Sequence, residues 1–141
     1  MVTGVAGGRR EYPEFGEFVA SLARDLNALS LQGWAVLVEG KRDAGALRAL
    51  GYGGKLATLG DLSRERARAF GGLGRVVVMT DLDREGARLA SRCVRELAGM
   101  GLKASLAERR RLKGASRGVF LHIENLGRFA DPEPLGRAKS L

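Results

Sequence analysis

The sequence has little of the residue types on which several common site chemistries depend. Cys93 is the single cysteine, so the chain has no intramolecular disulfide and no zinc site built from cysteines. Its position on an apolar helical face favours a core role over that of a nucleophile. His122 is the single histidine, and because it lies in an apolar segment with the pattern of a strand, we interpret it as structural rather than catalytic.

Long apolar runs are also missing. No run approaches the roughly 18–20 apolar residues that cross a bilayer, and no charged-then-apolar leader opens the chain. We therefore expect a cytoplasmic protein without a membrane partner. The length of 141 residues and the hydrophobic content of 45% fit one globular domain. We place this domain at residues 14–130, between a flexible tail at 1–13 and a loose basic tail at 131–141.

Positive charge is in excess. The 24 lysines and arginines outnumber the 16 aspartates and glutamates, which gives a formal net charge of +8 and indicates a polyanionic partner such as RNA or DNA. The alternatives are a solvated basic surface, or an arginine preference inherited from a GC-rich genome. The densest basic segment contains Arg109, Arg110, Arg111 and Lys113.

Apolar runs of strand length alternate with helical patterns along the chain. The expected strands span residues 34–38, 55–59, 75–80, 102–106 and 119–123. The expected helices span residues 14–31, 43–50, 63–70 and 84–99, with Asp43 and Ser63 as N-caps of the second and third. In the last helix, the inward residues are Ala87, Ala90, Val94, Leu97 and Ala98. This alternation predicts an α/β fold with an open parallel sheet of four to five strands and helices on both faces.

Two of the predicted strands end abruptly in acids. Glu39 follows the run Ala-Val-Leu-Val, and Asp81 and Asp83 follow the run Val-Val-Val-Met-Thr. Parallel strands bring such residues together at their carboxyl ends, where three carboxylates would repel one another unless a cation lay between them. Oxygen ligands of this kind suit Mg²⁺ or Mn²⁺. The alternative is that these acids only cap the helices that follow.

The two acid-bearing segments carry a family resemblance. Leu-Val-Glu-Gly-Lys-Arg-Asp and Thr-Asp-Leu-Asp-Arg-Glu-Gly together resemble the Toprim domain, a Rossmann-like module shared by topoisomerases, bacterial primases and certain nucleases. The resemblance covers most of the chain. It implies that Glu39, Asp81 and Asp83 are catalytic residues and ligands of two Mg²⁺ ions, or of Mn²⁺. It also implies a role for Glu39 as general acid or base.

Charged residues flank the three acids. Lys41, Arg42 and Arg84 have the geometry to contact phosphates, and the alternative is that they are solvated and paired with nearby acids. Asp43 and Glu85 are candidates for orienting the metal ligands, although helix capping and dipole stabilisation explain them equally well.

Glu124 is a further candidate, because it follows the last predicted strand and is expected to approach the same sheet edge. In Toprim-type ribonucleases that mature small ribosomal RNA, a basic stretch and a strand ending in Glu follow the Asp-x-Asp helix. Residues 109–113 and Glu124 resemble that order.

The resemblance also limits the function. Strand passage needs a tyrosine nucleophile on a separate domain, and this chain has only Tyr12 and Tyr52 and no length for a gate. The zinc-binding domain that primases add is absent as well. A small stand-alone Toprim protein implies a Mg²⁺-dependent nuclease, a hydrolase acting on structured RNA or DNA. The alternatives are a non-catalytic metal- and nucleic-acid-binding subunit with a protein partner in a larger complex, and a primase-like nucleotidyltransferase.

Overall fold

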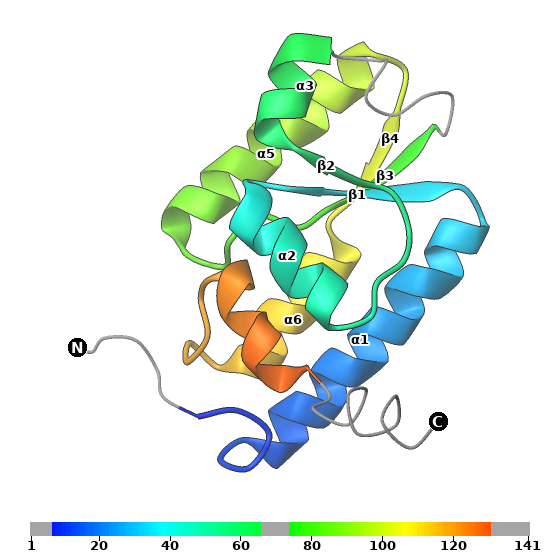
Figure 1. Ribbon diagram of the computed structural model, residues 1–141. Coiled ribbons are helices and arrows are strands. Elements are labelled where there is room, and N and C mark those ends of the chain that lie inside the picture. Colours follow the sequence, from blue (N-terminus) through cyan, green and yellow to red (C-terminus); the bar gives the residue numbers. More distant parts are fainter. Residues whose placement is uncertain (1–6, 66–73, 131–141) are drawn as a thin grey trace.

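Four parallel strands lie at the centre of the protein, whose computed structural model describes residues 7–65 and 74–130 (Figure 1). In chain order they are β1 (Trp34–Val38), β2 (Leu56–Thr58), β3 (Arg75–Val78) and β4 (Lys103–Ser105). Their order across the sheet is β2-β1-β3-β4, so β1 and β3 are neighbours at its centre. The expected α/β class with an open parallel sheet is confirmed.

Helices cover both faces of this sheet (Figure 1). One face carries α1 (Pro13–Leu31), α2 (Lys41–Ala49), α6 (Ala107–Ser116) and the 3-10 helix η1 (Ile123–Phe129). The other face carries α3 (Leu59–Glu65) and α5 (Arg84–Gly99). No helix within the described ranges combines the length and apolar character that crossing a membrane requires.

Side chains of the two central strands alternate between these faces, as extended backbone dictates. Val36, Val38, Val77 and Met79 pack with α1, α2 and η1. Ala35, Leu37, Val76 and Val78 pack with Ala90, Cys93 and Leu97 of α5. Because both faces are covered, the strands read as continuous apolar runs. The core position expected for Cys93 is confirmed, and burial raises the pKa of its thiol to about 11, so the thiol is unreactive at neutral pH.

The helix of residues 84–99 lies where its pattern predicts, with one difference in the residues that it buries. Ala90 and Leu97 are buried as expected, whereas Ala98 is exposed. Gly101, at φ +81°, adopts a left-handed conformation just beyond the end of this helix.

The starts of α2 and α3 differ from the prediction. Gly40 is the N-cap of α2, and Asp43 lies one turn into the helix, where its Oδ2 accepts the amide N–H of Gly40 at 3.2 Å. Ser63 lies inside α3 rather than at its start, because that helix already begins at Leu59. Residues 66–70 of the expected third helix lie outside the described ranges.

The prediction of a strand at residues 119–123 is wrong. Leu121 accepts one hydrogen bond, from the amide of Leu82 at 2.7 Å, and the chain then turns into η1 instead of forming a ladder. The apolar residues of this segment are buried against helices: Phe120 stacks on Phe15 of α1, with ring centroids 5.0 Å apart. A short apolar run is therefore a core segment here without being a strand.

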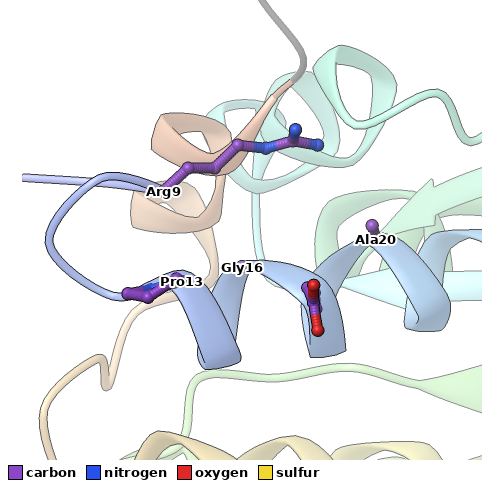
Figure 2. A pocket seen from close by; sticks show the side chains of 5 residues that line it. Arg9, Pro13, Gly16 and Ala20 are labelled. Atoms are coloured by element: carbon purple, nitrogen blue, oxygen red, sulfur yellow. The ribbon is translucent and has the colours of Figure 1, made fainter.

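The described part of the expected N-terminal tail contacts the domain. Tyr12 packs edge-to-face on Phe120 at 5.0 Å, and Nε of Arg9 donates to the carbonyl of Phe129 at 3.0 Å. Figure 2 shows the side chains that line a pocket beside this segment, namely Arg9, Pro13, Gly16, Glu17 and Ala20, none of which belongs to the acid-bearing segments. Residues 1–6 and the expected tail at 131–141 lie outside the described ranges.

Candidate metal centre

The acids after β1 and β3 meet at the carboxyl edge of the sheet. The two strands pair in parallel, with Leu37 opposite Val78, so the residues that follow them emerge side by side. Oε2 of Glu39 accepts the backbone N–H of Asp81 at 2.9 Å. The first acid-bearing turn therefore contacts the second directly.

Asp81 and Asp83 form a compact group with His122. Each offers one ligand atom, and these atoms all lie within 4.8 Å of one another. Nδ1 of His122 is 3.2 Å from Oδ2 of Asp81 and 3.9 Å from Oδ2 of Asp83. Glu39 is not one of this group, and its Oε2 accepts the amide of Asp81.

His122 is a candidate metal ligand that the sequence did not predict. It is half-exposed beside Asp81 instead of lying in an apolar strand, so the expected strand position is wrong. The amide of the next residue, Ile123, donates to Oδ1 of Asp81 at 2.9 Å and fixes the segment against the acids. The only available signal was the polar pair His122 and Glu124 on either side of Ile123, which is weak.

Asp83 also caps a helix. Its Oδ1 accepts the N–H of Gly86 at 2.8 Å at the start of α5. The capping alternative considered for this acid is therefore realised, and it leaves Oδ2 facing His122. One carboxylate thus both starts the helix and borders the compact group.

The electrostatics of this edge reflect crowded negative charge. The pKa of Glu39 is raised by burial and further by the charges of Asp81, Asp43 and Asp83. The pKa of Asp43 is raised by burial and then by the charge of Asp81. The pKa of His122 is raised mainly by its hydrogen bond to Asp81. The part of each shift that comes from neighbouring carboxylates is the part that a cation bound beside them would offset.

Arg109 of α6 contacts the backbone of the turn that follows β3. Its side chain is only 6% exposed, its Nε donates to the carbonyl of Thr80 at 3.2 Å, and its Nη2 donates to the carbonyl of Asp81. The sequence predicts a nucleic-acid contact for Arg109 together with Arg110, Arg111 and Lys113. Its burial corrects that prediction, since both bonded nitrogens serve the protein's own backbone.

Comparison with known families agrees with this geometry. A family model described as a Toprim domain matches residues 33–108, which is more than half of the chain. The chain belongs to the Toprim family. No curated protein matches it. A solved protein from Aquifex aeolicus shares the fold at a TM-score of 0.62 and 24% identity, over 75% of this chain and 95% of that one.

Toprim domains bind divalent metals, and the donor set of this Toprim chain fits such an ion. Carboxylate oxygens are the ligands that Mg²⁺ prefers, and one imidazole nitrogen beside them also suits Mn²⁺. Asp81, Asp83 and His122 offer these donors within one small space. Family membership and this candidate site together indicate a metal-dependent function connected with nucleic acids.

The basic residues predicted to flank the acids lie exposed at this edge of the Toprim domain. Lys41 and Arg42 open α2, and Arg84 opens α5. None of the three forms an ion pair within residues 7–65 and 74–130, so the paired alternative considered for them is not observed there. On α6, Arg110 and Lys113 are exposed as well, whereas Arg111 lies 3.4 Å from Asp25 of α1.

The three acids suggested as supporting residues differ in position. Asp43 is 7% exposed, accepts the amide of Gly40, and is also hydrogen-bonded by the backbone of Glu124. Glu124 itself is exposed in the first turn of η1, so it reaches the expected edge from a helix rather than from a strand. Glu85 pairs with Arg88 on the exposed surface of α5.

Proposed function

We propose that this protein is a Mg²⁺- or Mn²⁺-dependent nuclease that hydrolyses phosphodiester bonds in structured RNA or DNA. The observation that carries the proposal is the convergence of Asp81, Asp83 and His122 within 4.8 Å, beside Glu39. A divalent ion bound there would activate a water and stabilise the leaving oxygen of a phosphodiester.

The chain's own residues would supply the remaining parts of such a site. Asp81, Asp83 and His122 would hold the ion. The Ile123 amide donates to Oδ1 of Asp81 and so would keep this carboxylate in place beside the other two ligands. Glu39 has a pKa raised above its ordinary value, mainly by burial, and a raised pKa favours a carboxyl group that exchanges a proton during the reaction. Its second carboxylate oxygen is the atom available for that role.

Exposed cations around the acids support a nucleic-acid substrate. Lys41, Arg42 and Arg84 stand in the first turns of the two helices that begin at the site, where backbone N–H groups also favour anions. Arg110 and Lys113 extend positive charge along α6. With a net charge of +8, we expect binding to weaken steeply as salt is raised.

The test is a panel of structured RNAs, single strands and duplex DNAs incubated with purified protein and Mg²⁺ or Mn²⁺. Wild type should cut at least one class, and Asp81→Asn should lower the rate by at least about 100-fold. Asn keeps an Oδ1 for the Ile123 amide, so the fold should survive. Glu85→Gln is the matched control, because that carboxylate faces Arg88 and should be dispensable for cleavage.

Three other results would redirect the proposal. Undiminished cleavage by Asp81→Asn would contradict the assigned site. Tight metal-dependent binding of a nucleic acid without any cleavage would indicate a binding subunit that lends its acids to a larger complex. Incorporation of a labelled nucleotide under the same conditions would indicate nucleotidyl transfer.

A further inference from the structure

Arg109 is a buried cation close to the acids of the candidate site. Arg109 is 6% exposed, in contrast to its neighbours Arg110 and Arg111 on the same helix. Its guanidinium bridges two consecutive carbonyls, those of Thr80 and Asp81. These carbonyls belong to the turn that carries the Asp-x-Asp pair.

Burying a guanidinium is unfavourable unless charge and hydrogen bonds compensate for the lost water. Two carbonyls supply hydrogen bonds but no net negative charge. The charge is available nearby, because the carboxylates of Asp83, Glu39 and Asp81 all act electrostatically on Arg109 and oppose the effect of its burial. The arginine remains protonated at any working pH.

The three acids repel one another unless positive charge lies nearby. Glu39 touches the backbone of Asp81, and Asp83 lies two residues further on, so three carboxylates share one edge of the sheet. Arg109 approaches them from α6, and its hydrogen bonds go to the carbonyls of Thr80 and Asp81 and not to the carboxylates.

We propose that Arg109 is a positioning residue, a fixed internal cation that holds the 80–81 backbone in place and offsets the charge of Glu39, Asp81 and Asp83, so that the site is assembled before a metal ion binds. It does not touch substrate. The proposal deepens the proposed metal site and rests on it for the role of the three acids. Its electrostatic part concerns the metal-free protein alone.

A double-mutant cycle in the presence of a chelator tests this role. Arg109→Met removes the charge and the hydrogen bonds, and Asp83→Asn removes one carboxylate while keeping a residue that can still cap α5. Urea unfolding gives the folding equilibrium constant of the wild type, both single variants and the double variant. Asp83→Asn should favour folding about tenfold more in the Arg109→Met background than in the wild type.

Two matched variants separate charge from packing. Arg109→Lys keeps the charge but cannot bridge two carbonyls. The effect of Asp83→Asn on folding should therefore be about the same in the Arg109→Lys background as in the wild type. Arg110→Met removes an exposed charge from the same helix and should show no coupling. Equal effects of Asp83→Asn in the wild-type and Arg109→Met backgrounds would overturn the proposal.

The proposal remains testable if Arg109→Met alone does not fold. Folding should then return when Asp83→Asn is added, or when Mn²⁺ replaces the lost positive charge. Failure of both rescues would show that Arg109 acts through its hydrogen bonds and packing and not through its charge, and would overturn the proposal that it offsets the charge of the acids. Because the cycle is measured without metal and without nucleic acid, its outcome is independent of whether the protein is a nuclease.

Discussion

The turn after β1 and the turn after β3 both carry acids of the site, but they are held in different ways. The β1–α2 turn has one local bond, in which Asp43 accepts the N–H of Gly40 three positions earlier, and one distant bond, in which Glu39 accepts the N–H of Asp81. The β3–α5 turn is fixed from a distance: Arg109 donates to its carbonyls, and the amide of Ile123 donates to Asp81.

This difference shows that the two turns do not contribute equally to the site. A Cβ added at Gly40 would meet no atom within 4 Å, whereas Gly86 packs directly against the backbone of Asp81. Thr80 adds a buried hydrogen bond to the carbonyl of Gly86 at 2.7 Å. The second turn therefore has little space for a larger side chain, and changes there should propagate to the acids.

The largest expected effect comes from adding one methyl group at Gly86, next to the β3–α5 turn. In Gly86→Ala, the new Cβ would lie 1.8 Å from the carbonyl oxygen of Asp81, so the backbone must move. We expect a loss of about 3 kcal/mol in the free energy of unfolding, measured in urea. Mn²⁺ binding, measured by calorimetry, should weaken with it because Asp81 moves.

Gly45→Ala, in the helix that follows the β1–α2 turn, is the matched control. Nothing lies within 4 Å of a Cβ at Gly45, which is inside α2. Alanine should therefore stabilise the protein by about 0.5–1 kcal/mol through its higher helix propensity. Similar unfolding curves for the two variants would remove the distinction between the turns.

A smaller effect should separate the acids by their metal affinity. Asp83 faces the compact group and Glu39 faces the backbone of Asp81, so Asp83→Asn should weaken Mn²⁺ binding by about 100-fold and Glu39→Gln by about 10-fold. Isothermal titration calorimetry measures both. The α5 start should survive in Asp83→Asn because Asn is a good N-cap. A larger loss for Glu39→Gln would reverse the ranking of the two turns.

The same contrast explains how much of the site could be predicted from the sequence. The two strand–acid units are local patterns: an apolar run, an acid, then a helix. They were sufficient to predict β1, β3 and α5, and to bring Glu39 and Asp81 to one edge.

The groups that hold the second turn leave no such pattern. Arg109 contacts Thr80 across 29 positions, and His122 contacts Asp81 across 41. In the sequence, Arg109 looks like the other members of a basic run, and His122 looks like part of a strand. Only the packing of α6 and η1 against the sheet distinguishes them, because burial and direction come from contacts between distant segments.

The smallest effect is expected for Asp43, in the first turn of α2. Burial, and then the charge of Asp81, raise the pKa of Asp43 above its ordinary value. The folded state therefore binds a proton more readily than the unfolded state, so this group's contribution to stability falls as pH rises through that raised pKa. Asp43→Asn removes the charge and keeps an oxygen for the Gly40 amide. In metal-free protein at pH 7, we expect it to raise the free energy of unfolding by less than about 1 kcal/mol.

The pH dependence separates this charge effect from a change in capping. The advantage of Asp43→Asn should shrink as the pH is lowered through the raised pKa of Asp43, because Asp43 of the wild type then becomes neutral as well. Urea unfolding at several pH values with a chelator present measures it. A difference between variant and wild type that stays constant with pH would mean that the capping hydrogen bond, and not the buried charge, governs the first turn. The two turns would then differ only in their distant contacts.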